Sequence, residues 1–253
     1  MALRITRLLA TIFMIAMNSL AVTLPLNGMS TGALSDLLYT VITPAGFTFS
    51  IWSVIYIGLI GLTIAVVSKK IQLPDRAMVW YIVSALANGL RIFARHYQSL
   101  HLSMIIMFIL LMSLIMLDRT LIKNATTIAY YQRVRGTVLL YLGRVLIATL
   151  LITLIYAKYQ LNIISTYEVQ IGMGIIILAW CTNLLIICRE KNIITSLVAI
   201  WALYGIMSGQ NDPQIILTAQ IVIVILALGI AYHEGKKYMK TTPMPEINPG
   251  NRF

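Results

Sequence analysis

The sequence predicts an all-α membrane protein, a polytopic helix bundle with about eight transmembrane helices. Apolar residues make up 59% of the 253 residues, only 11% are charged, and the mean hydropathy is +0.87. A soluble domain is usually about 45–50% apolar and about 25% charged, so this composition excludes a soluble globular protein. Long unbroken apolar runs such as 102–117 and 214–232 argue against a β-barrel, whose strands alternate over about ten residues.

Reading the apolar runs as helices gives eight predicted spans, each bounded by turn residues or charges. Most have close to the ~20 residues that cross a bilayer core. They cover residues 8–24, 46–68, 77–97, 101–118, 137–157, 168–187, 193–208 and 214–233.

The first predicted helix, 8–24, has two interpretations. Arg4 and Arg7 precede its apolar run, and residues 19–21 (Ser-Leu-Ala) resemble a cleavage site, a pattern typical of a signal peptide. Cleavage would leave seven spans and an outside N-terminus. We expect the segment to be retained as a transmembrane helix.

The second predicted helix, 46–68, opens with an aromatic stripe. Pro44 lies where a proline in the first helical turn loses no hydrogen bond. Phe49 precedes Trp52 by three residues and Tyr56 follows it by four, so the three rings share one helix face. Such a stripe is typical of packing or interface anchoring, and ligand contact is the alternative.

The third predicted helix, 77–97, contains a polar row inside the membrane. Ser84, Asn88, Arg91 and Arg95 follow helical spacing along one face. An arginine in the bilayer costs about 3 to more than 10 kcal/mol and needs a partner, a water-filled cavity or a route to the interface.

Arg144 is a third arginine within a predicted span, three residues after Tyr141 in the fifth helix. We expect Asp118, Glu168 and Glu234 to mark helix ends, which leaves the three arginines without a carboxylate in the bilayer. Unpaired guanidinium groups in a cavity favour an anion. Snorkelling to the interface is the alternative, easiest for Arg95 and hardest for Arg144.

The net charge of +11 follows the connections between spans. Fifteen Lys and Arg residues fall on one side of the eight-span model and only Lys158 on the other, which predicts that both termini are cytoplasmic. This pattern requires no nucleic acid, and some of these charges can attract anionic lipid headgroups. The basic segments are the N-terminus, 69–76, 119–135, 189–191 and the polar, proline-rich tail, whose residues 236–253 we expect to be disordered.

The sequence has few other residues that could form a metal site or an active site. Cys181 and Cys188 lie in one apolar run and indicate free thiols. His96, His101 and His233 lie apart, with no metal-ligand spacing, although His96 near the outer interface could be an axial haem ligand. No phosphate-binding glycine loop or nucleophile elbow is present, so we expect no metal site, no catalytic residue and no enzyme activity.

The segment 43–56 has the pattern Pro-x-x-x-x-Phe-x-x-Trp-x-x-x-Tyr, and with it the chain resembles the TspO/MBR-related tryptophan-rich sensory proteins, in particular their longer, about eight-helix group. These are relatives of the bacterial counterparts of the mitochondrial translocator protein. Further landmarks of the resemblance are Asn18, Leu24-Pro25-Leu26-Asn27-Gly28, Asn88, His96-Tyr97, Tyr141-Leu142-Gly143, Ile200-Trp201-Ala202-Leu203 and Gly205-Ile206.

The resemblance implies a TspO-like five-helix region at 1–158, a three-helix transmembrane extension at 159–235 and the tail at 236–253. It implies residence in the bacterial cytoplasmic membrane as a multi-pass protein. The chain also departs from the group, whose members usually carry tryptophan where this sequence has Arg91, Arg95 and Arg144. If those tryptophans line the ligand cavity, this chain binds a more acidic ligand or has lost the family's function.

We therefore expect an amphipathic, anionic ligand in a cavity between helices, for sensing, sequestration or transport. The resemblance implies that this ligand is a tetrapyrrole such as haem or porphyrin, or a sterol-like lipid. The other expected partner is the lipid bilayer around the protein. Two alternatives are a small secondary transporter of an organic anion and a non-catalytic subunit whose arginines pair with a partner's acids; a monomer and a homodimer both stay open. The candidate ligand-binding residues are Phe49, Trp52, Tyr56, Asn88, Arg91, Arg95, Tyr141 and Arg144.

The long connection 25–43 provides a first prediction. The family resemblance implies a lid over the ligand cavity, whereas its polar residues are equally typical of a solvated connector. A lid predicts that deletion within 27–36 speeds ligand release without unfolding the bundle, measured by stopped-flow fluorescence. An unchanged release rate would contradict the lid.

Overall fold

The computed structural model describes residues 2–24, 26–29, 31–123, 128–162, 166–190 and 193–241, and these residues form helices and connections without a β-strand. The elements are α1 (Ala2–Thr23), α2 (Thr31–Leu37), the 3-10 helix η1 (Gly46–Ser50), α3 (Ile51–Val67), α4 (Asp75–His96), α5 (Leu100–Lys123), α6 (Ile128–Tyr159), α7 (Glu168–Glu190), α8 (Ile194–Gly209) and α9 (Pro213–Thr241).

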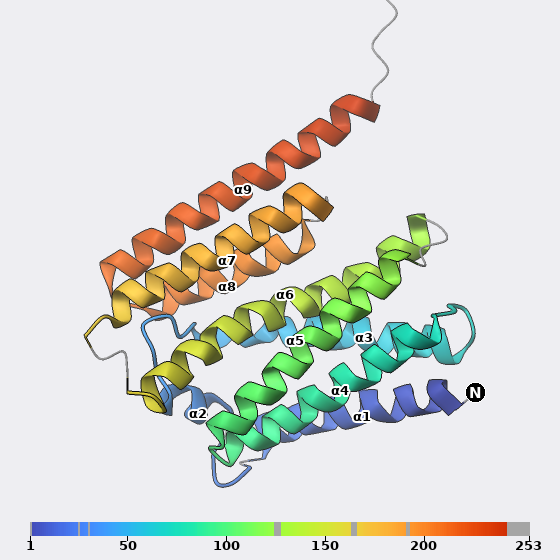
Figure 1. The fold of residues 1–253 in the computed structure, drawn as a ribbon, viewed down its shortest axis with the longest axis horizontal. Coiled ribbons are helices and arrows are strands. Elements are labelled where there is room, and N and C mark those ends of the chain that lie inside the picture. Colours follow the sequence, from blue (N-terminus) through green and yellow to red (C-terminus); the bar gives the residue numbers. More distant parts are fainter. Residues whose placement is uncertain are drawn as a thin grey trace, which may run out of the picture.

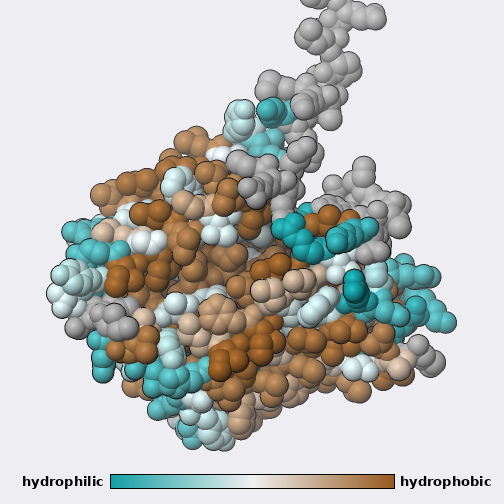
Figure 2. Space-filling model, viewed as in Figure 1, coloured by the Kyte–Doolittle hydropathy of each residue, from teal (hydrophilic) through white to brown (hydrophobic). Residues whose placement is uncertain are grey.

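The described helices confirm the predicted helical membrane bundle. Seven of them are long and apolar enough to cross a membrane. On the face drawn in Figure 2, hydrophobic residues form a broad band along the helices and hydrophilic residues gather at the two ends. In Figure 1 the start of α1, the α3–α4 connection and the ends of α5, α7 and α9 lie at one end, which we call the basic end.

The eighth predicted span, 193–208, corresponds to the shorter helix α8. Its 16 residues extend about 24 Å, less than the ~30 Å core of a bilayer. It runs alongside α7 and α9 (Figure 1) and packs against both of them and against α6. Helix neighbours thus replace lipid around most of α8, and Gln210 ends it before the opposite end of the bundle.

Five helices form a closed ring. Helix α1 packs against α3 and α4, α4 packs against α5, α5 against α6, and α6 returns to α3. One hydrophobic core cluster joins all five, with buried members such as Met14 of α1, Leu59 of α3 and Met107 of α5. Since α1 closes this ring, cleavage of 1–21 would remove one of its walls.

The helices α7, α8 and α9 pack on one another and reach the ring mainly through α8, which contacts α6 and η1; α7 also contacts α6. A second core cluster joins them to α6 through residues such as Ile147 and Leu154. The predicted boundary at 158 falls between α6 and α7, and independent folding of the two parts stays a prediction. Helix α9 continues to Thr241, past the predicted tail start at 236, and residues 242–253 lie outside the described residues.

The predicted loop 119–135 is largely helical, because α5 runs on to Lys123 and α6 begins at Ile128. The expectation that Asp118 marks a helix end is therefore wrong. Arg135 donates Nε to Asp118 Oδ1 at 2.6 Å and Nη2 to Oδ2 at 3.0 Å, and both side chains are at most 4% exposed. This bidentate pair offsets the cost of burying both charges, so the helices continue past the charges that were expected to stop them. Glu234 likewise lies inside α9.

Arg7 is buried, whereas the sequence pattern placed it in a solvated N-terminal segment. Helix α1 begins at Ala2, so the predicted start at residue 8 is too late. The Arg7 Cζ lies 4.0 Å from the centre of the Tyr81 ring, and Thr11 Oγ1 lies 2.9 Å from the Tyr81 hydroxyl. The aromatic face stabilises the cation and fixes α1 against α4.

The connection between α1 and η1 is anchored to the bundle along its length. Leu34 and Leu38 are buried in a small cluster with Leu100 and Ile155. Gln210 then donates Nε2 to the carbonyl oxygen of Thr43 at 2.6 Å. These contacts fix the direction in which the chain enters η1.

Two glycines of α8 let η1 approach closely. A Cβ at Gly205 would collide with the Thr48 side chain, and one at Gly209 would lie 2.6 Å from the backbone nitrogen of Ala45. Between them, Ala45 donates its N–H to the Gly205 carbonyl at 2.8 Å. Trp201 also donates Nε1 to the Thr48 carbonyl at 3.2 Å, so α8 determines the position of η1 and of the start of α3.

Gly209→Ala should destabilise the protein by about 1–3 kcal/mol, because a backbone atom blocks the added methyl group and cannot move aside cheaply. Thermal unfolding in detergent measures the effect. Gly61→Ala in α3 is the matched control, since nothing lies within 4 Å of its added Cβ. Equal melting temperatures for the two variants would contradict the close packing of α8 on η1.

Candidate functional site

The predicted aromatic stripe lines the inside of the five-helix ring. Pro44 precedes η1, one residue earlier than its Ala45 N-cap, and Phe49 lies within η1. Trp52 and Tyr56 of α3 stack with ring centres 5.4 Å apart, and the Trp52 ring meets Tyr141 of α6 edge-on at 5.8 Å. The stripe therefore bridges α3 to α6.

A hydrogen-bond relay crosses the ring beside this aromatic stack. Asn18 of α1 donates Nδ2 to Asn88 Oδ1 at 2.7 Å, and Asn88 of α4 donates its own Nδ2 to the Tyr141 hydroxyl at 2.8 Å. The Tyr141 hydroxyl donates in turn to Met14 Sδ at 3.7 Å. Asn88 is 0% exposed, and its amide has partners on two helices.

Arg144 lies near the middle of α6. It is only 4% exposed, and its Cζ lies 5.7 Å from the ring centres of both Phe49 and Trp52. The candidate span begins at Val134, about 15 Å away along the helix axis at 1.5 Å per residue. This burial is incompatible with a snorkelling side chain, and the aromatic faces supply only part of the stabilisation that water would give.

Arg91 and Arg95 of α4 lie on the same side of the ring. Arg91 is 9% exposed and Arg95 is half-buried. The three guanidinium groups carry the same charge and repel one another. The eight candidate residues are thus brought together, as the sequence pattern predicts; whether they bind a ligand stays a prediction.

The arginines have no anionic counterpart within the described part of the chain. Arg91, Arg95 and Arg144 form no hydrogen bond or ion pair with the described residues, and the Nε atoms of Arg91 and Arg144 are buried without a partner. The Tyr56 hydroxyl is also buried and unpartnered. The ring centre therefore has several unused hydrogen-bond donors around a concentration of positive charge.

The other polar groups near the ring are satisfied locally. Ser84, which shares the predicted polar row, donates to the Tyr81 carbonyl at 2.7 Å. Two acidic side chains of the bundle are neutralised by ion pairs: Asp118 of α5 by Arg135, and Glu168 of α7 by Lys158 at 2.9 Å. The positive charge of the ring centre is thus not cancelled by these carboxylates.

The histidines do not assemble into a metal site. His96 is 0% exposed, with Nδ1 2.9 Å from the Ile92 carbonyl and Nε2 buried without a partner. His101 Nδ1 lies 2.6 Å from the Tyr156 hydroxyl, and His233 Nδ1 lies 3.2 Å from Glu234. Among the described residues no group of three His, Cys, Asp or Glu could hold a metal ion.

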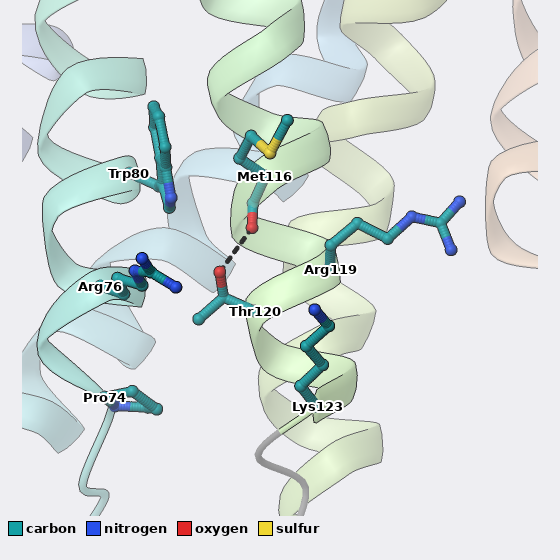
Figure 3. Close-up of a pocket in the computed structure, with 7 residues that line it drawn as sticks. All are labelled: Pro74, Arg76, Trp80, Met116, Arg119, Thr120 and Lys123. Atoms are coloured by element: carbon teal, nitrogen blue, oxygen red, sulfur yellow. Dashed lines mark hydrogen bonds between the residues drawn. The ribbon is translucent and has the colours of Figure 1, made fainter.

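Two cavities among the described residues lie outside the arginine and aromatic cluster. One, of about 20 Å³, is an apolar recess among α6, α7 and α8. The other, of about 510 Å³, lies between α4 and α5 at the basic end and is drawn in Figure 3. Sequence reasoning missed this second cavity, because it treated these cations as a sign of membrane orientation and of general attraction to lipid headgroups, and could not show which of them face one another.

The two tyrosines of the site should respond differently to loss of their hydroxyl groups. Tyr141→Phe leaves an amide N–H of Asn88 buried without an acceptor, which costs about 1–3 kcal/mol. Tyr56→Phe removes a hydroxyl that has no partner, so stability should stay equal or rise slightly. Thermal unfolding of both variants in detergent checks the contrast, and equal destabilisation would contradict the relay.

Comparison with known proteins agrees with this architecture. No curated protein and no solved structure matches the chain significantly. The model of one family, TSPO-like protein, matches residues 4–232, which covers all five ring helices and most of the three that follow. This extent confirms the resemblance seen in the sequence motifs, and the chain belongs to the TSPO-like family.

Proposed function

We propose that this TSPO-like membrane protein binds an amphipathic anionic ligand at the centre of the five-helix ring. The observation that carries the proposal is the presence of two buried arginines, Arg91 and Arg144, without a described counter-ion. Because a charge in a low-dielectric interior is costly unless it is paired, a bound anion would relieve this cost. Binding energy would then come from groups that the folded chain leaves unsatisfied.

The surroundings of the arginines define the class of ligand. Phe49, Trp52 and Tyr141 offer flat apolar surface, and the Tyr56 hydroxyl offers a hydrogen bond. A planar, apolar molecule with carboxylates suits this combination better than a neutral sterol. A porphyrin is such a molecule, with two carboxylates for the two buried guanidinium groups, and we propose a tetrapyrrole such as porphyrin or haem as the ligand.

Access to the ring centre would require movement, because Arg91 and Arg144 are at most 9% exposed. Helix α3 is the ring helix most free to move, since it packs less extensively on its ring neighbours α1 and α6 than the other ring helices pack on theirs. We propose that separation of α3 from α6 opens the ring to the ligand. A binding site that opens in this way is compatible with sensing, sequestration or transport.

A partner subunit is a weaker explanation of the arginines. A partner's acid would have to reach Arg91 and Arg144 from outside the chain, but these side chains are at most 9% exposed. The burial therefore favours a small ligand that enters the ring. We also propose a binding role in preference to a catalytic one, because the TSPO-like family is generally non-enzymatic.

The charge distribution supports a cytoplasmic position of both termini. The ends of α1, α3, α5, α7 and α9 that lie at the basic end (Figure 1) adjoin the connections in which Lys and Arg concentrate. Basic residues are retained on the cytoplasmic side of membranes. We propose a multi-pass protein of the bacterial cytoplasmic membrane with its basic end in the cytoplasm.

Binding should depend on carboxylates of the ligand and on the two arginines. Purified protein is titrated with protoporphyrin IX and with its dimethyl ester, which lacks the negative charges, and tryptophan quenching reports binding. The native chain should bind the acid at least about tenfold more tightly than the ester. Arg91→Leu combined with Arg144→Leu should remove this preference and stabilise the unliganded protein, because two unpaired buried charges are lost.

Lys69→Gln with Lys70→Gln is the matched control, because it removes the same charge from exposed positions outside the ring. This variant should bind like the native chain. Equal binding of acid and ester, or a double arginine variant that loses stability, would contradict the proposal. Gradient-dependent uptake of protoporphyrin into proteoliposomes would further identify a transporter.

A further inference from the structure

The cavity between α4 and α5 is separate from the ring centre. It has a volume of about 510 Å³ and lies where α4 begins and α5 ends, at the basic end of the bundle. In Figure 3, Arg76 and Trp80 of α4 face Thr120 of α5, whereas the Arg119 side chain extends away from α4. The cavity lining consists of Pro74, Arg76 and Trp80 from the α4 side and Met116, Arg119, Thr120 and Lys123 from α5.

The lining has three cations and no acid. Arg76 and Lys123 are exposed and form no hydrogen bond or ion pair with the described residues. The neighbouring carboxylate on α5, Asp118, is buried and bound to Arg135, so it does not neutralise them. Thr120 donates its hydroxyl proton to the Met116 carbonyl at 2.7 Å (Figure 3), so its proton is already used. Charge complementarity therefore calls for an anion.

The pocket changes from charged to apolar along the helix axes. Trp80 lies one helical turn past Arg76, about 6 Å further from the end of the bundle, and Met116 lies about 10 Å before Lys123. Met116 is 39% exposed on the apolar outer surface. Tryptophan beside cationic side chains is typical of the membrane interface. The pocket thus presents cations at the interface and an apolar wall towards the hydrocarbon.

We propose that this pocket binds the phosphate headgroup of an anionic membrane lipid. Arg76 and Lys123 contact the phosphate, Arg119 adds positive charge nearby, and the first part of an acyl chain lies along Trp80 and Met116. The same cations could bind a free phosphate ester, but such a ligand would leave the apolar wall unused. A bound lipid joins the start of α4 to the end of α5 and stabilises the bundle at this end.

Lipid binding is tested on the purified full-length chain in neutral detergent. Dioleoyl phosphatidylglycerol, dioleoyl phosphatidylcholine or inorganic phosphate is added, thermal unfolding is followed, and native mass spectrometry counts the lipids retained. Phosphatidylglycerol should raise the melting temperature saturably and leave one retained lipid, and phosphatidylcholine and inorganic phosphate should not. The variant Arg76→Gln with Lys123→Gln should raise the half-saturating phosphatidylglycerol concentration about tenfold or more.

Lys69→Gln with Lys70→Gln is the matched control, because it removes two charges from exposed positions at the same end of the bundle but outside the pocket. It should keep the native response to phosphatidylglycerol. Equal weakening in both variants would show diffuse attraction and overturn the proposal. An equal effect of inorganic phosphate would assign the pocket to a soluble ester, and no preference for phosphatidylglycerol over phosphatidylcholine would exclude the site.

Discussion

The uncompensated positive charge at the centre of the five-helix ring is the constraint on which the rest of the site depends. Arg91 and Arg144 are nearly excluded from solvent, and no described carboxylate faces them. By contrast, the buried carboxylate of Asp118 and the buried guanidinium of Arg135 neutralise each other. Buried charge without such a partner lowers stability, which is common at functional sites.

The aromatic and amide groups around the arginines hold this arrangement together. Phe49 and Trp52 place ring faces near Arg144, and the Asn18–Asn88–Tyr141 relay ties α1, α4 and α6. The three C-terminal helices contribute through α8, whose glycines and Trp201 determine the position of η1. They therefore take part in shaping the site, although they contribute none of the candidate residues.

Much of this fold follows from sequence patterns, because long apolar runs in a membrane protein have few alternatives to helices. The grouping of Trp52 and Asn88 also follows, since both are landmarks of the family resemblance, whereas Arg144 departs from the family and was recognised as a charge inside a span. The burial of Arg7 and the Asp118–Arg135 pair could not be predicted, because each depends on a partner from a distant helix. A single sequence shows a charge but not the side chain that will face it.

The length of α8 and the location of the larger cavity depend on tertiary packing in the same way. Gln210, the extended C-cap residue of α8, binds the Thr43 backbone, 167 residues away in the chain. The cavity is lined by residues of two helices, such as Arg76 of α4 and Lys123 of α5, and the sequence of neither helix alone predicts it.

The central claim is that a bound anion compensates the arginines of the ring. The most direct test is an experimental structure of the protein purified from the membrane of its own cells, at a resolution that resolves bound ligands. The account predicts non-protein density within about 3 Å of the guanidinium groups of Arg91 and Arg144, in contact with the Trp52 and Tyr56 rings. Guanidinium groups solvated by ordered water alone would contradict it.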